Sequence, residues 1–242
     1  MALDLSTLLS RLDAVMIDLD GTMVDTMGDF EAALNLCLAD IDLPKVSPAV
    51  VNIAVGKGSE HLIRTVLRHQ LELPEVKASG VVCDNTTVEH LFEPAFARYQ
   101  FHYERVNGKF AQTYPGVLPG LQRLHDRGLK MACLTNKPTA FAKALLADKG
   151  LAGFFSQVYG GDAFPRKKPD PMPLLETCKA LGTTPSRTLM LGDSQNDALA
   201  ARAAECPVVL VTYGYNHGQP IRQTPALAWV DSLVELGPIC GL

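Results

Sequence analysis

The sequence predicts an α/β fold, in which a Rossmann-like, doubly wound parallel sheet carries an α-helical cap domain inserted after its first strand. Two observations predict it. Short aliphatic segments alternate with helical patterns over the second half of the chain, and one long interval near the start contains helical patterns alone. Strands that alternate with helices form parallel sheets covered on both faces.

Five segments are short and rich in aliphatic residues, as strands buried on both faces are. They are residues 14–17 (AVMI), 129–134 (LKMACL), 156–160 (SQVYG), 187–191 (RTLML) and 207–211 (PVVLV). Proline, Asp or Asn near the start and Gly near the end mark several helices between them. These predicted helices are residues 120–128, 138–151, 170–182 and 196–205.

The interval from residue 23 to residue 107 contains no predicted strand. Apolar residues recur there at three- and four-residue spacings, which is the helical period, in residues 29–40, 58–73 and 86–106. A helical block directly after the first strand predicts an inserted lobe. The predicted division is an α/β core of residues 1–22 and 108–242, a cap of residues 23–107, and hinges at residues 20–26 and 107–116.

The composition indicates an ordinary globular protein of the cytoplasm. The 242 residues are 47% hydrophobic, which suffices for one good core with a smaller second lobe. The net charge is −4 and the basic residues are scattered, so we expect no nucleic-acid partner. The first 15 residues lack the features of a secretory signal, no apolar run is long enough to span a membrane, and the six cysteines form no C-x-x-C pair. Nothing in the pattern indicates an oligomeric state.

Polar side chains follow three of the predicted strands. In an open parallel sheet, ligands bind outside the carboxyl ends of the strands, so these residues predict the site. They are Asp18 and Asp20 after the first strand, Thr135 and Asn136 after the second, and Asp193 after the fourth, with Asp197 shortly beyond.

These groups fit a phosphorylated substrate and Mg²⁺. Carboxylates close together repel by about 4 kcal/mol per pair at an effective dielectric constant of about 20, so a cation must neutralise them. Hard oxygen ligands that leave room for water and a phosphate oxygen select Mg²⁺ rather than zinc. A lysine of the segment RKKPDP, Lys167 or Lys168, would balance the charge of the phosphate. We therefore expect a small anionic phosphorylated substrate.

The spacing of Asp18 and Asp20 predicts that both carboxylates act on the same phosphorus atom. Residues i and i+2 of an extended segment point to the same side, so both carboxylates can reach one phosphorus atom. One can attack phosphorus and form an aspartyl-phosphate, while the other protonates the leaving oxygen and later activates water. Thr135 and backbone N–H groups near Asn136 would hold the oxygens of the transferred group.

Four motifs in this order resemble those of the haloacid dehalogenase superfamily of Mg²⁺-dependent phosphotransferases. They are DLDGTMVDT, LTNK, KKPDP and LGDSQND, and they span nearly the whole chain. The resemblance implies that Asp18 is the nucleophile and Asp20 the acid and base. It also favours Lys168 over Lys167, because Lys168 directly precedes the proline of the motif. The implied metal site consists of Asp18, the backbone carbonyl of Asp20 and Asp193, with Asp197 either at the metal or orienting Lys168.

The inserted lobe resembles the cap of the phosphoglycolate phosphatase branch of that superfamily. The segments VGKGSEHLI, from Val55, and YPGVLPGLQRLHDRG, from Tyr114, carry this similarity. It implies hydrolysis of 2-phosphoglycolate to glycolate and phosphate. Lys57, between two glycines, could present its ammonium to an anionic substrate, or it could be an ordinary solvated lysine.

Other functions share these features. A sugar-phosphate mutase of the β-phosphoglucomutase type uses the same nucleophile, acid and cap, and a phosphonate hydrolase could form a Schiff base through Lys57. A catalytically idle protein that binds phosphorylated ligands is a third alternative. Single motifs also have structural interpretations, since Thr135-Asn136 and Asp197 could each cap a helix.

Overall fold

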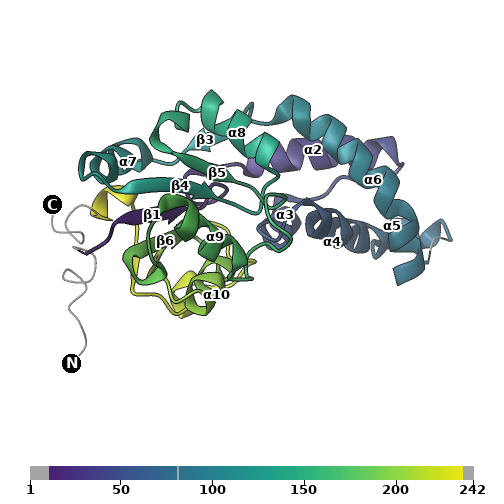
Figure 1. The fold of residues 1–242 in the computed structure, drawn as a ribbon. Helices are drawn as coiled ribbons and strands as arrows, with labels where there is room; N and C mark the ends of the chain where they lie inside the picture. The colour runs from purple at the N-terminus through teal and green to yellow at the C-terminus, as the bar shows by residue number, and fades with distance from the viewer. Residues whose placement is uncertain (1–10, 81, 237–242) are drawn as a thin grey trace.

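The computed structural model describes residues 11–80 and 82–236, and a six-stranded parallel sheet lies at its centre (Figure 1). The strand order is β5-β4-β1-β6-β7-β8. The strands are β1 (Ala14–Ile17), β4 (Lys130–Leu134), β5 (Gln157–Tyr159), β6 (Thr188–Gly192), β7 (Val208–Val211) and β8 (Ala228–Val230). The first five confirm the predicted strands. Strand β8, a three-residue strand at the edge of the sheet, is not among the predicted strands.

Helices cover both faces of the sheet, as a doubly wound fold requires. The side chains of Val15 and Ile17 pack on one face with α7 (Val117–Asp126) and α8 (Thr139–Asp148). The opposite face, on which Met16 lies, packs against two further helices, α9 (Met172–Leu181) and α10 (Gln195–Ala203). Successive side chains of a strand point to opposite faces, so β1 is apolar throughout because both faces are buried.

Strand β1 occupies the position where the strand order reverses. From β1 the chain adds β4 and β5 on one side, and then β6, β7 and β8 on the other. β1 pairs in parallel with both β4 and β6. Loops that leave such a strand in opposite directions open a crevice at its carboxyl end, where ligands bind in this class of fold.

The chain between β1 and β4 contains a helical insertion, as predicted. Its helices are α2 (Met27–Asp40), α3 (Pro48–Ala54), α4 (Ser59–Leu71), α5 (Pro74–Ala78) and α6 (Asn85–Val106). Figure 1 shows α2, α4, α5 and α6 extending away from the sheet. Leu34, Leu62, Val66 and Tyr99 belong to a buried cluster of the insertion, separate from the two clusters on the sheet. The division at residues 23 and 107 stays a prediction.

The two connections between sheet and insertion pair with each other. The outgoing segment forms β2 (Val24–Asp25) and the returning segment forms β3 (Gln112–Thr113), and the two strands are antiparallel. The expectation that residues 23–107 contain no strand is therefore wrong at β2. A two-residue strand is shorter than any readable period, which is why the pattern does not reveal it. The chain consequently enters and leaves the insertion at one place.

Within the described residues, no helix is both long and apolar enough to cross a membrane. Five cysteines are free thiols, namely Cys37, Cys83, Cys133, Cys178 and Cys206. The predictions made for residues 1–10 and for Cys240 lie outside the described residues.

Candidate active site

The predicted polar residues converge at the carboxyl ends of three neighbouring strands. Asp18 directly follows β1, Thr135 directly follows β4, and Asp193 directly follows β6. Asp18, Thr135 and Asp193 are 8%, 3% and 2% exposed, respectively. Because β1 lies between β4 and β6, these three positions meet at the switch point of the sheet.

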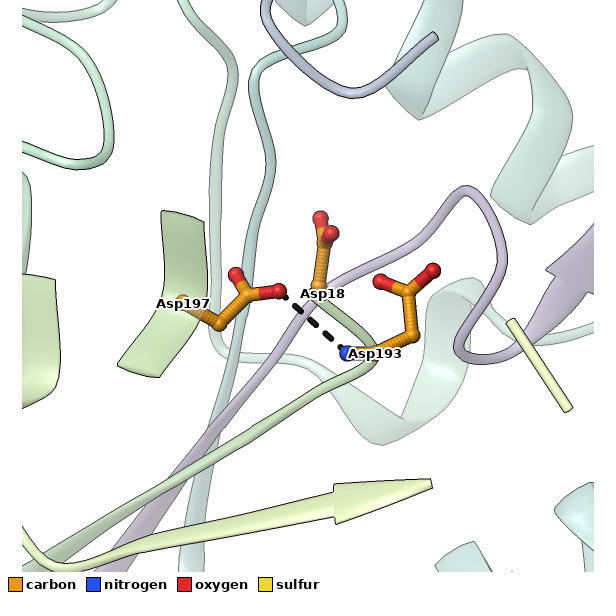
Figure 2. Close-up of side chains that lie close together, drawn as sticks. All are labelled: Asp18, Asp193 and Asp197. Atoms are coloured by element: carbon orange, nitrogen blue, oxygen red, sulfur yellow. Dashed lines mark hydrogen bonds between the residues drawn. The ribbon is translucent and has the colours of Figure 1, made fainter. Parts of the chain in front are cut away.

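Three carboxylates form a buried group that can hold a metal ion. One carboxylate oxygen from each of Asp18, Asp193 and Asp197 lies within 4.8 Å of the others, and Figure 2 shows the three side chains close together. Two glycines make room for Asp193. A Cβ atom at Gly21 would lie 2.2 Å from Oδ2 of Asp193, and one at Gly214 would lie 2.2 Å from its Cβ. A larger residue at either position would displace the carboxylate.

The pKa values of Asp18 and Asp193 are raised, which indicates that the metal-free site has too little positive charge to keep both carboxyl groups ionised. The pKa of Asp18 is raised to about 6, mainly by burial; the charge of Lys168 opposes this rise, and the neighbouring carboxylates of Asp197 and Asp20 add to it. Burial, followed by the charges of Asp197 and Asp18, raises the pKa of Asp193 well above its ordinary value. A divalent cation bound by these oxygen atoms would restore both groups to the ionised state.

Lys168 lies at the base of the site, beside Asp18 and Asp197. Its Nζ is 2.7 Å from Oδ1 of Asp197 and 3.1 Å from Oδ1 of Asp18, and it donates to the backbone oxygen of Leu134 at 2.7 Å. Burial by itself lowers the pKa of Lys168, but the two carboxylates outweigh it and the pKa is raised. The ammonium group is therefore charged and held from three sides. Lys167 is only partly buried, and it is Lys168 rather than Lys167 that pairs with the carboxylates of the site.

Asp197 caps a helix and contacts Lys168, which are two of the three roles that the sequence leaves open; the third is metal binding. Its Oδ2 accepts hydrogen bonds from the N–H groups of Asp193 and Ser194 and from the hydroxyl of Ser194, which forms a capping box at the start of α10. Its Oδ1 accepts from Lys168. With both oxygens engaged, Asp197 caps a helix and also positions the lysine.

Thr135 and Asn136 follow β4 and do not cap α8, whose N-cap position is Pro138. The hydroxyl of Thr135 accepts from the N–H of Lys137 at 3.2 Å. The amide of Asn136 donates to the backbone oxygen of Lys168 at 2.8 Å and to that of Gly56 at 3.0 Å. Asn136 thus connects the backbone at Lys168 to the loop of the insertion that contains Gly56.

The insertion covers the site and closes a cavity over it. The backbone oxygen of Gly56 accepts from Asn136 and also from Asn196, at 3.1 Å, so two core side chains hold one loop of the insertion. The cavity has a polar floor from the sheet and a largely apolar roof from the insertion. Its lining residues are Asp18, Asp20, Phe30, Val55, Gly56, Gly58, Ser59, Leu62, Thr135, Asn136, Lys137, Asp193, Ser194 and Tyr215.

Asp20 faces this cavity and forms an ion pair that the sequence does not predict. Its Oδ1 lies 2.9 Å from Nζ of Lys137, the last residue of the motif LTNK. The motif could have drawn attention to Lys137, but a lysine three residues beyond a strand is most often solvated. Here the residue is only 5% exposed.

Lys57 is exposed and does not line the cavity that contains Asp18 and Asp20. It lies beside a neighbouring groove together with His61, Arg64 and Lys167. Gly56 and Gly58, which flank it, do line the main cavity. The structure therefore brings the glycine backbone of this loop to the site, but not the ammonium group of Lys57.

In the absence of metal, an Asp18→Asn protein is expected to be more stable than the wild type near neutral pH. The pKa of Asp18 in the folded protein, about 6, lies above its ordinary value of 3.8, so ionised Asp18 opposes folding at higher pH. This cost disappears as the pH falls toward 3.8. Between about pH 7.5 and about pH 5.5, the stability difference between the two proteins should shrink by roughly 1 kcal/mol.

Urea unfolding of both proteins in EDTA at the two pH values measures this difference. Titrating groups far from Asp18 contribute equally in both proteins and cancel. A difference that grows as the pH falls would show that the charge of Asp18 stabilises the metal-free fold, and would contradict the raised pKa of this carboxyl group.

Comparison with known proteins gives the family. Residues 12–205 match the haloacid dehalogenase-like hydrolases. A phosphoglycolate phosphatase of Thiobacillus denitrificans is 39% identical over 224 residues, which is 93% of each chain. One of Vibrio cholerae is 38% identical over 218 residues, covering 88% of this chain and 90% of its own. A crystal structure described as a predicted phosphoglycolate phosphatase, from Haemophilus somnus, matches with a TM-score of 0.86 at 30% identity, covering 95% of this chain and 98% of that one.

The chain therefore belongs to the haloacid dehalogenase-like hydrolase family, which confirms the resemblance carried by its four motifs. It is similar over nearly its full length to phosphoglycolate phosphatases. The structure combines a group of buried carboxylates, a lysine that pairs with two of them, and a helical insertion between β1 and β4.

Proposed function

We propose that this protein is a Mg²⁺-dependent phosphomonoester hydrolase that converts 2-phosphoglycolate to glycolate and phosphate. The observation that carries the proposal is the buried group of Asp18, Asp193 and Lys168 at the switch point of the sheet, beneath a helical insertion. The full-length similarity to phosphoglycolate phosphatases supports the substrate. The cavity beside this group is small, about 30 Å³ measured for the centre of a water molecule, so it suits a small substrate.

In this proposal Asp18 is the nucleophile. Its carboxylate attacks phosphorus and forms an aspartyl-phosphate, while the oxygen of glycolate leaves. Asp20, which faces the same cavity, gives that oxygen a proton and then takes one from the water that hydrolyses the aspartyl-phosphate. Lys168 and Thr135 stabilise negative charge on the oxygens of the transferred group. The insertion excludes bulk water during these steps.

The oxygen donors present fit Mg²⁺. Asp18, Asp193 and the backbone carbonyl of Asp20 would hold the ion, and the raised pKa values of the two carboxyl groups support this assignment, because they favour added positive charge in the pocket. When bound, Mg²⁺ supplies charge that draws the phosphate against the carboxylates. We assign Asp197 to the positioning of Lys168, because both of its oxygens are already engaged.

We propose that the chain divides into a catalytic core and a cap. Residues 1–22 and 108–242 would form the phosphatase core and residues 23–107 the cap, supported by the separate hydrophobic cluster of the insertion and by the β2–β3 pair at its base. We also propose that the enzyme works in the cytoplasm, where thiols stay reduced, because the five cysteines of the described residues are free.

Phosphate release from a panel of phosphorylated compounds tests the function. The panel contains 2-phosphoglycolate, β-glucose-1-phosphate and phosphonoacetaldehyde, each with Mg²⁺ and with EDTA. We expect 2-phosphoglycolate to be hydrolysed fastest, and EDTA to reduce release by at least about a hundredfold, because the carboxylates then repel the phosphate. Equal rates in EDTA would contradict the role of metal, and preference for another member would contradict the substrate.

A further inference from the structure

We propose that Lys137 binds the carboxylate of the substrate and thereby selects short phosphomonoesters that carry a carboxylate group. This inference rests on the proposed phosphatase function and adds the residue that determines its specificity. Lys137 comes from the core, directly after Thr135 and Asn136, yet its ammonium group lies against side chains of the insertion.

The position of Lys137 places it on the side of the leaving group. Its Nζ is 2.9 Å from Oδ1 of Asp20, the residue proposed to protonate the leaving oxygen. In 2-phosphoglycolate a single methylene separates that oxygen from the carboxylate. An ammonium group bound to Asp20 would therefore lie near the carboxylate of the substrate, because Asp20 would contact the ester oxygen on the side away from phosphorus.

The hydrogen bonds of Lys137 leave one donor for a ligand. An ammonium group has three N–H donors. One is directed to Asp20 and one to the hydroxyl of Tyr103 on α6. The aromatic rings of Phe30 and Tyr103 lie 4.9 Å and 4.7 Å from Nζ. Among the described residues no other acceptor engages Nζ, and the residue lines the cavity, so a ligand can supply the third acceptor.

The charges of the cavity make this contact selective. Among the described residues that line the cavity, Lys137 is the only one with a basic side chain, while Asp18, Asp20 and Asp193 are acidic. A second anionic group of a substrate would be attracted to Lys137 and repelled by the carboxylates. The apolar side chains of Phe30 and Leu62 strengthen the attraction there by excluding water.

A matched pair of substrates tests the assignment. 2-Phosphoglycolate and 2-hydroxyethyl phosphate have the same ester and chain length, but the second has a neutral hydroxyl in place of the carboxylate. The measurement is the ratio of their kcat/KM values in the wild type, in Lys137→Met and in Lys143→Met. Lys143 is an exposed lysine of α8 and serves as the matched control.

We expect the ratio to fall at least about tenfold in Lys137→Met and to stay unchanged in Lys143→Met. A Lys137→Met protein that loses activity on both substrates equally would overturn the inference, since Lys137 would then act only by positioning Asp20. If Lys137→Met does not fold, Lys137→Gln decides, because it keeps a polar side chain at this position but removes the positive charge. Its ratio should fall at least about fivefold, and an unchanged ratio overturns the inference. A wild type that hydrolyses neither substrate contradicts the proposed function itself.

Discussion

Replacement of Asp18 with Asn is expected to lower the rate of phosphate release from 2-phosphoglycolate by at least about a thousandfold. Asp18 lies one residue beyond β1, and its Oδ1 accepts a hydrogen bond from the N–H of Leu19 at 2.8 Å. The amide oxygen of Asn can keep this bond, so the side chain should hold its place. The amide is a poor nucleophile and a weaker metal ligand, so the chemical step is lost while the fold is kept.

Steady-state phosphate release with saturating Mg²⁺ measures this effect. Asp126→Asn is the control, because Asp126 is an exposed carboxylate at the end of α7, remote from the carboxyl ends of the strands. It should retain the parent rate. An Asp18→Asn protein that released phosphate as fast as the parent would exclude Asp18 as nucleophile.

Replacement of Lys168 with Met should cost both activity and stability. The ammonium group lies between Asp18 and Asp197, and its removal leaves buried carboxylates without their cation. Breaking a buried ion pair by removing one partner costs about 3–5 kcal/mol. We expect a loss of stability of that size, and a fall in kcat because charge on the transferred phosphoryl group is no longer balanced.

Lys167→Met is the matched control for this variant. It makes the same change at the neighbouring residue, which is partly buried and outside the carboxylate group. Urea unfolding should show a change below about 1 kcal/mol for Lys167→Met, typical of a residue near the surface. Equal losses of stability in the two variants would contradict the role assigned to Lys168.

The core of the fold could be predicted because its strands are buried on both faces. Such strands read as unbroken aliphatic runs, and the runs that became β1, β4 and β6 end at polar residues. Parallel strands bring their carboxyl ends to one edge, so the meeting of Asp18, Thr135 and Asp193 follows from the order of elements alone. Strand β2 escaped prediction because two residues show no period, and the short edge strand β8 was also missed.

The site residues that escaped prediction depend on the contact between core and insertion. The partner of Asp20 is Lys137, whose burial requires Phe30 and Tyr103 to cover it. No spacing along the chain reveals that contact, because α2 and α6 lie far from the motif LTNK in sequence. For the same reason the sequence could not decide whether Lys57 reaches the cavity. Its loop does so through Gly56 and Gly58.

The most direct test of covalent catalysis by Asp18 is to locate the phosphoryl group on the enzyme during turnover. The wild type is mixed with 2-phosphoglycolate and Mg²⁺, quenched in acid after milliseconds, digested and analysed by mass spectrometry. We predict a phosphorylated peptide with the phosphoryl group on Asp18, and no such peptide from the Asp18→Asn protein. Rapid release of phosphate with the phosphoryl group on another residue, or on none at any quench time, would contradict the assignment of Asp18 as nucleophile.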